Sequence, residues 1–171
     1  MAHPSQKDFF NNVKAKYPSK FTSVYVLDCG SLDINGSLKD LFSNSTYTGV
    51  DIVAGKNVDV VSKISDLSFN MQFDTLVSGE MLEHDETWRE SLLTMYNLVK
   101  HGGLIAISCA GKDRPEHGTK KSDGNEWGTG DYYQNLEPSH LKTIYQDKMF
   151  KTSHYEVNIP QHDTYFYGIK V

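Results

Sequence analysis

The sequence has few long hydrophobic segments, few cysteines and no excess of positive charge. Its longest apolar run, at residues 104–110, is far shorter than the ~20 residues that a membrane-spanning helix needs, and no apolar segment follows the polar residues 1–8. We therefore expect no membrane association and a cytoplasmic protein. Lys and Arg number 17 against 22 Asp and Glu, a formal net charge of −5. A broad field that attracts nucleic acid is not expected from this balance.

The two cysteines, Cys29 and Cys109, both fall at the carboxyl ends of predicted strands. One strand between them would separate them by about 9–10 Å, which excludes a disulfide. No His-x-x-x-His or paired cysteine spacing is present, and Glu83, His84 and Asp85 are neighbours whose side chains we expect to point in different directions. The sequence therefore predicts no disulfide and no metal site. Its length of 171 residues predicts a single domain, 1–171, with a sizeable core.

What the sequence does contain is an apolar strand that runs directly into a glycine-rich turn, at residues 24–38. Gly30 and Gly36 tolerate the backbone angles that let a main chain approach a ligand closely. Asp51 ends a second strand-like run, 23 residues after Asp28, a spacing at which a carboxylate can accept a hydrogen bond from a ribose hydroxyl. Leu32 stands where a dinucleotide-binding pattern needs its second glycine. The turn therefore favours a nucleoside ligand without a pyrophosphate, such as S-adenosylmethionine (SAM).

Five segments together carry a family resemblance that covers nearly the whole chain. They are residues 27–36 (LDCGSLDING), 47–52 (YTGVDI), 80–85 (EMLEHD) with Trp88, the pair Gly102 and Gly103, and 114–119 (RPEHGT). In this order they resemble the class I SAM-dependent methyltransferases, in particular a small-molecule branch similar to methyltransferase type 11. The resemblance implies a Rossmann-like α/β fold with helices on both faces of a seven-stranded, mostly parallel sheet. It also implies strand order 3-2-1-4-5-7-6 with strand 7 antiparallel, and SAM as the cofactor.

Hydrophobic periodicity assigns most of the chain to regular elements. We predict a lead-in helix within residues 1–20, a short helix at 37–42, a helix from Trp88 closed by residues 100–103 and capped by Asp85, and a helix from Pro138 that includes Met149. Predicted strands follow the order of the chain: 24–29, 47–52, 58–61, 73–79, 104–109, 155–159 and 164–171. The last two strands are expected to form an antiparallel hairpin because only four residues join them.

The resemblance implies a cofactor site at the carboxyl ends of the first strands. The expected cofactor-binding residues are Asp28, Gly30, Ser31, Leu32, Asn35, Gly36, Asp51, Ile52, Lys63, Ile64, Glu80 and Met81. Lys63 departs from the family pattern, which usually has an acid there to bind the adenine amine. Recognition of adenine is then left to the backbone N–H of Ile64, or to Asp66 if the loop is shifted.

The expected catalytic residues follow the fourth strand and lie in the long loop. His84 is the first candidate for a general base because its ordinary pKa suits neutral pH; Glu83 and His117 are the others. The alternatives are that His84 only hydrogen-bonds a loop or the cofactor, and that His117 only orders the loop.

Residues 110–135 show no periodic pattern, and so long a loop in a small domain is functional or disordered. We predict that residues 111–133 form an active-site loop or lid, with Arg114 and His117 facing a small anionic or sugar-like acceptor. Trp127 or the Tyr132 and Tyr133 pair would wall the pocket. The basic loop residues could grip a phosphate or carboxylate, or could simply be solvated.

The expected function is methyl transfer to a small-molecule acceptor. Two patterns of nucleic-acid methyltransferases are missing: residues 78–81 are SGEM where an Asn/Asp-Pro-Pro-aromatic turn would stand, and neither cysteine follows a proline. The alternatives left open are methylation of nucleic acid or protein and a non-catalytic SAM-binding module.

Overall fold

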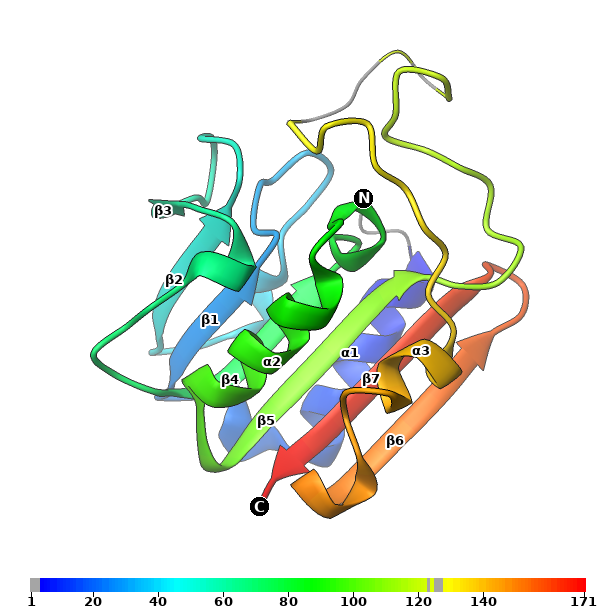
Figure 1. The fold of residues 1–171 in the computed structure, drawn as a ribbon. Coiled ribbons are helices and arrows are strands. Elements are labelled where there is room, and N and C mark those ends of the chain that lie inside the picture. Colours follow the sequence, from blue (N-terminus) through cyan, green and yellow to red (C-terminus); the bar gives the residue numbers. More distant parts are fainter. Residues whose placement is uncertain (1–3, 123, 125–127) are drawn as a thin grey trace.

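A computed structural model of the chain describes residues 4–122, 124 and 128–171. Seven strands form one sheet in the order β3-β2-β1-β4-β5-β7-β6 (Figure 1). In chain order they are β1 (Tyr25–Cys29), β2 (Thr46–Asp51), β3 (Val60–Val61), β4 (Phe73–Gly79), β5 (Val99–Ala110), β6 (Phe150–Asn158) and β7 (Asp163–Lys170). β1 to β5 pair in parallel, and β7 runs antiparallel to both β5 and β6. The predicted strand order and the reversed strand are confirmed.

Helices cover both faces of the sheet, as predicted. α1 (Pro4–Lys16) lies behind the sheet in Figure 1, while α2 (Trp88–Leu98) and α3 (Pro138–Lys142) lie in front. The two faces carry separate hydrophobic clusters, because alternate residues of each central strand point to opposite faces. Val26 and Val77 belong to the cluster beneath α1, and Leu27 and Leu76 to the cluster beneath α2.

Short 3₁₀ helices fill much of the connecting chain. They are η1 (Pro18–Lys20), η2 (Leu38–Leu41), η3 (Ile64–Asp66), η4 (Leu82–His84) and η5 (Asp147–Met149). η2 is the helix predicted at 37–42, reduced to one 3₁₀ turn whose N-cap Ser37 accepts a hydrogen bond from the Lys39 N–H. Such a short element leaves the glycine-rich turn open on that side.

Four predicted boundaries were wrong. The strand predicted at 155–159 begins five residues earlier, since β6 starts at Phe150. The helix predicted from Pro138 ends at Lys142, and its later residues form a turn and η5. α2 ends at Leu98, and residues 99–103 already belong to β5, where the register against β4 shifts. Gly102, with φ of 74°, sits in that irregularity instead of closing the helix. Asp85 is not the N-cap of α2; that position is Thr87, whose N–H and hydroxyl both donate to the Asp85 carboxylate.

Two further expectations concern the thiols and the membrane. Cys29 and Cys109 are both buried and free, so the prediction of no disulfide is confirmed. None of the helices within the described residues is long and apolar enough to cross a bilayer.

Candidate active site at the carboxyl edge of the sheet

A cavity of about 770 Å³ opens where β1, β2 and β4 end. All twelve residues predicted to bind the cofactor line it, together with His84 and His117. Its wall also contains residues that the sequence did not single out, among them Gln6, Phe10, Ser37, Leu38, Ser62, Glu86, Thr87, Gly128, Thr129 and Gly130. One cavity therefore joins the predicted cofactor residues to two of the three predicted catalytic residues.

The glycine turn after β1 is shaped by contact with the turn after β4. Gly30 has φ of 86°, and a Cβ built on it would lie 2.5 Å from Met81 Cβ. Any larger residue at position 30 would therefore be strained and would collide with the β4 turn. The Gly30 and Ser31 N–H groups both donate to the Val50 carbonyl oxygen, at 2.8 and 3.1 Å, which fixes the turn against β2.

Asp51, at the end of β2, ties the glycine turn to the next loop. One carboxylate oxygen accepts from the Leu32 N–H at 3.1 Å, and the other accepts from the Val53 N–H at 3.2 Å. Burial raises its pKa above the ordinary value. Each oxygen keeps a further lone pair, so Asp51 can hold the turn and still accept a hydrogen bond from a ligand in the cavity.

Asp28 and Gln6 bring polar atoms to the α1 side of the cavity. The Tyr47 hydroxyl donates to Asp28 Oδ2 at 2.5 Å, while Oδ1 has no hydrogen-bond partner among the described residues. Burial raises the pKa of Asp28 to about 7. Gln6 is 2% exposed, and its side-chain nitrogen likewise lacks a partner there. Sequence reasoning missed Gln6, although a polar residue one turn before Phe10 on an otherwise apolar helix face could have marked it.

Lys63 and Ile64 lie where the resemblance places the adenine ring. Lys63 is exposed at the N-cap of η3, and Ile64 is buried as its first residue. An N–H in the first turn of a helix has no intrahelical partner. The cavity wall therefore offers a backbone donor at Ile64 beside an exposed lysine.

A cluster of buried carboxylates lies beyond the end of β4. Glu80 follows Gly79 with φ of 53°, a left-handed conformation that is unfavourable for a residue with a side chain. The Glu80 side chain is 2% exposed and that of Glu83 is fully buried. None of their four carboxylate oxygens accepts a hydrogen bond of ordinary geometry from a described residue, although the backbone N–H groups of Glu83 and Ala110 act on the Glu83 carboxylate and oppose the rise in its pKa. Burial raises the pKa of both, and the charge of Glu83 raises that of Glu80 further.

Two histidines and a tyrosine close over these carboxylates. The rings of His84 and His117 meet edge to face with centroids 5.1 Å apart, and Tyr133 packs on both, at 5.4 and 5.1 Å. His117 Nε2 lies 3.8 Å from Glu83 Oε1 and 3.9 Å from Glu80 Oε2. The structure thus brings His84, Glu83 and His117 together, although they come from η4 and from the distant loop.

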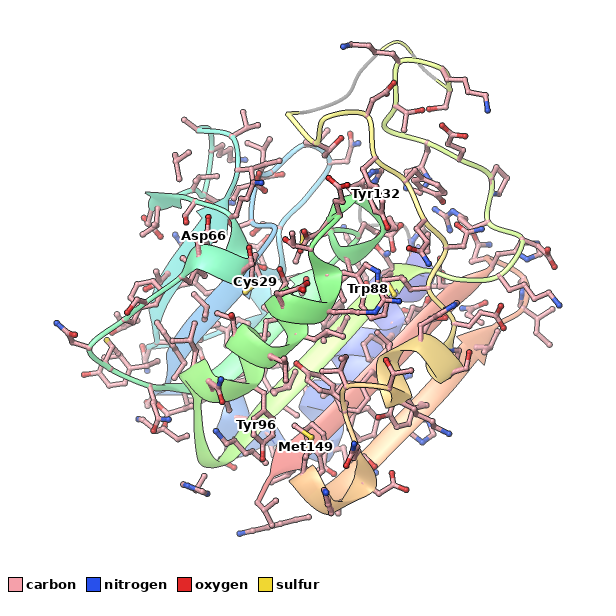
Figure 2. All side chains as sticks on the ribbon, viewed as in Figure 1. Cys29, Asp66, Trp88, Tyr96, Tyr132 and Met149 are labelled. Atoms are coloured by element: carbon pink, nitrogen blue, oxygen red, sulfur yellow. The ribbon has the colours of Figure 1, made fainter. Side chains whose placement is uncertain are left out.

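The described residues of the loop, 111–122, 124 and 128–133, lie beyond the carboxyl ends of the strands (Figure 1). The Gln134 N–H donates to the Glu83 carbonyl at 2.8 Å, and the Tyr133 hydroxyl donates to the Pro115 carbonyl at 3.2 Å. Figure 2 shows Tyr132 above the first turn of α2, where Trp88 lies. Tyr133 packs on both histidines, and neither tyrosine is among the residues that line the cavity, so the pair does not wall it as predicted. Trp127 lies outside the described residues.

Arg114 does not face a ligand as predicted. Its guanidinium donates to Asp163 Oδ1 and to the Gln161 carbonyl, each at 2.7 Å, and lies 3.6 Å from Glu80 Oε2. Because these contacts join the loop to β7, Arg114 is an anchor of the loop. The expectation was wrong because an arginine that is engaged by a distant strand cannot be distinguished in the sequence from one that is free.

Comparison with known proteins gives structural matches only. No family model matches the sequence, and no curated protein matches it significantly. Among solved structures, a 1,6-didemethyltoxoflavin-N1-methyltransferase from Burkholderia thailandensis covers the whole chain, with 92% of its own length aligned, 16% identity and a TM-score of 0.62.

Two further matches are also methyltransferases. The N-methyltransferase NodS from Bradyrhizobium japonicum, in complex with S-adenosylhomocysteine (SAH), covers 98% of this chain and 88% of its own, with 11% identity and a TM-score of 0.63. Phosphoethanolamine N-methyltransferase 2 from Haemonchus contortus, in complex with SAM, covers 93% and 52%, with 16% identity and a TM-score of 0.62.

The sheet order, the reversed β7 and these matches define the class of fold. The chain has the class I SAM-dependent methyltransferase fold over its whole length. At this level of identity the likeness establishes the fold and leaves activity to be argued from the site.

Proposed function

We propose that the protein is a SAM-dependent methyltransferase that acts on a small-molecule acceptor. The observation that carries the proposal is that one cavity holds both parts of such a site. The part near Asp28, Gly30 and Asp51 suits the methionine and ribose portions of SAM. The part near His84 and His117 suits an acceptor group.

Methyl transfer requires mainly alignment and exclusion of water. A lone pair of the acceptor forms a bond to the methyl carbon while the carbon–sulfur bond breaks, and its electrons stay on sulfur to give SAH. The acceptor's proton passes to a nearby group or to solvent. His84, Glu83 and His117 are the proposed residues around the acceptor, and Gly118 and residues 128–130 of the loop complete the wall that excludes water.

The cavity favours a hydroxylated or amine-bearing acceptor over an anionic one. Glu80 lines the cavity with buried carboxyl oxygens that accept no hydrogen bond from a described residue, and the guanidinium of Arg114 is engaged by Asp163. An acceptor with hydroxyl or amine groups, such as a sugar-like metabolite, could donate hydrogen bonds to these oxygens. The matched structures support a small acceptor, since one holds 1,6-didemethyltoxoflavin and another phosphomonomethylethanolamine.

Calorimetric titration with SAH and with NAD tests the cofactor. We expect SAH to bind more tightly than NAD. Asp51→Ala should weaken SAH by tenfold or more, because a charge-assisted hydrogen bond to the ribose is worth about 1.5–3 kcal/mol. Asp40→Ala is the matched control, since Asp40 is an exposed carboxylate of η2 that does not line the cavity.

Tighter binding of NAD, or an unchanged SAH affinity in a folded Asp51→Ala variant, would overturn the cofactor assignment. Transfer of labelled methyl from SAM is then measured on a panel of hydroxyl and amine metabolites, with RNA, DNA and protein as competing acceptors. If only RNA, DNA or protein were labelled, the proposed small-molecule acceptor would be wrong and the labelled macromolecule would take its place.

A further inference from the structure

The polar cluster beside the proposed cofactor pocket has the composition of a metal site. Glu83, His84 and His117 each offer one ligand atom, and these three atoms lie within 4.8 Å of one another. The sequence predicted that Glu83 and His84 would point apart, as adjacent residues do in a strand. They lie instead in the 3₁₀ turn η4, which directs both toward the loop.

The orientation of His117 is set from outside the cluster. Its Nδ1 lies 3.1 Å from the Pro115 carbonyl oxygen, and because a carbonyl only accepts, Nδ1 must carry the hydrogen. In the neutral ring Nε2 then carries a lone pair and no hydrogen. This nitrogen lies 3.8 Å from Glu83 Oε1 and 3.9 Å from Glu80 Oε2. A histidine that gives its other N–H to a backbone carbonyl is the usual arrangement of a metal ligand.

The charge in the cluster is incompletely balanced among the described residues. Of the three buried carboxylates Glu80, Glu83 and Asp163, two lie within ion-pair distance of the Arg114 guanidinium, Glu80 at 3.6 Å and Asp163 at 2.7 Å. The Glu83 side chain is fully buried, and neither of its oxygens accepts a hydrogen bond of ordinary geometry from a described side chain or backbone group. Buried carboxylates are normally paired or bound to a metal because burial of an isolated charge is costly.

The loop is also shaped to hold the His84 ring in place. Gly118 has φ of 66°, and a Cβ built on it would lie 2.8 Å from His84 Cε1. His117 thus supplies one ligand, and the absence of a side chain at Gly118 leaves space for the imidazole of His84. Tyr133 packs against both rings from the other side.

We propose that Glu83, His84 and His117 form a binding site for one divalent transition-metal ion of the zinc type. Two imidazoles and a carboxylate are ligands that favour zinc and its neighbours over magnesium or calcium. Metal–ligand bonds of 2.0–2.2 Å place ligand atoms roughly 3–3.5 Å from one another. Side-chain rotations that move each ligand atom by about 1 Å would bring all three to bonding distance of one ion. Three protein ligands leave coordination positions open toward the cavity.

The role of the ion rests on the proposed function. An acceptor hydroxyl bound at an open position would be held beside the methyl group, with a further lone pair on its oxygen left to attack the methyl carbon. Its pKa would fall, as it does for water on zinc. Binding of the ion itself does not depend on that role, so the two can be tested separately.

Calorimetry with Zn²⁺ and absorption spectroscopy with Co²⁺, on tag-free protein stripped with a chelator, test the site. We expect one Zn²⁺ per chain and a Co²⁺ spectrum typical of nitrogen and oxygen ligands, with no competition from excess Mg²⁺. His117→Ala and the isosteric Glu83→Gln should each weaken Zn²⁺ at least a hundredfold. His154→Ala is the matched control, because His154 lies 3.5 Å from Glu156 as an exposed His–Glu pair on β6.

Absence of Zn²⁺ binding, or equal weakening by His154→Ala, would overturn the inference. Circular dichroism of each variant in chelator establishes folding, and Glu83→Gln keeps the test decisive if a histidine variant does not fold. SAH binding without Zn²⁺ binding would refute the metal site and leave the proposed function intact. Zn²⁺ binding without SAH binding would support the metal site and refute the proposed function.

Discussion

Buried charged side chains differ in their hydrogen bonding between the two ends of the sheet. At the end away from the cavity, Lys170 is 6% exposed, and its ammonium donates to the carbonyls of Tyr96 and Val99, each at 2.8 Å. It also lies 4.3 Å from the centre of the Tyr96 ring. Figure 2 shows Tyr96 near Met149 at this end, far from Tyr132. At the cavity end, Glu83 is more deeply buried, and its carboxylate accepts no hydrogen bond of ordinary geometry from a described residue.

This difference separates charges that serve the fold from charges that serve a ligand. A buried charge with full hydrogen bonding is compatible with a stable fold, whereas one without it lowers stability. Sequences break this rule mainly at functional sites, where a ligand supplies the missing partner. The prediction is that removing a charge should destabilise one end and stabilise the other.

Lys170→Met should have the largest effect on stability. The change keeps most of the apolar stem but removes two charge-assisted hydrogen bonds and the contact with the Tyr96 ring, a loss of about 3 kcal/mol in the free energy of unfolding. Urea denaturation measures it. Lys151→Met, at an exposed position of β6, should stay within about 0.5 kcal/mol of the wild type. Equal losses in the two variants would remove the distinction between the ends.

Asp28 should give a smaller, pH-dependent effect on SAH affinity. Its pKa of about 7 is raised by burial, opposed by the Tyr47 hydroxyl and assisted by the charge of Asp51. If Asp28 binds the ligand's ammonium, only the ionised carboxylate is competent. The affinity should rise about fifteenfold between pH 5.5 and pH 7, roughly 1.6 kcal/mol, as the ionised fraction grows from about 3% to about 50%.

Calorimetry across this pH range checks the slope. Asp28→Asn keeps an acceptor for the Tyr47 hydroxyl and should give a weaker, nearly flat profile. A variant that retains the wild-type slope would assign the dependence to another group that faces the cavity.

Most of the fold could be predicted because it depends on local patterns. Apolar runs with turn residues between them indicated the first five strands, alternating patterns indicated the last two, and the resemblance supplied their order. The errors came where tertiary contacts decide an end. β5 begins at Val99 because Val99 pairs with Phe73 of β4, before a register irregularity that ends where Leu104 pairs with Thr75. The sequence alone reads Gly102 and Gly103 as a helix stop.

The cofactor side of the cavity could be located from the sequence for a related reason. The carboxyl ends of parallel strands meet at one edge, so residues such as Asp28, Asp51 and Met81 converge once the strand order is known. The acceptor side could not be located in this way. The contact of His117 with η4 depends on a loop held by Arg114 and Asp163, residues 49 positions apart.

Glu83→Gln should have the smallest effect and the opposite sign to Lys170→Met. The substitution preserves shape while removing a buried negative charge that faces the lone pair of His117 Nε2 and lies near Glu80. In chelator at neutral pH it should raise the free energy of unfolding by about 1 kcal/mol, the scale of relieving one poorly paired polar group. Urea denaturation measures it beside Lys170→Met.

Glu156→Gln is the control for this change, because Glu156 is a half-exposed carboxylate that also faces a histidine; it should change stability by less than about 0.5 kcal/mol. With added Zn²⁺ the wild type should become more stable than Glu83→Gln, because an ion that binds the folded wild type more tightly than the variant adds to the stability of the wild type by mass action. If Glu83→Gln destabilised the metal-free protein as much as Lys170→Met does, Glu83 would serve the fold. The contrast between the two ends of the sheet would then carry no information about function.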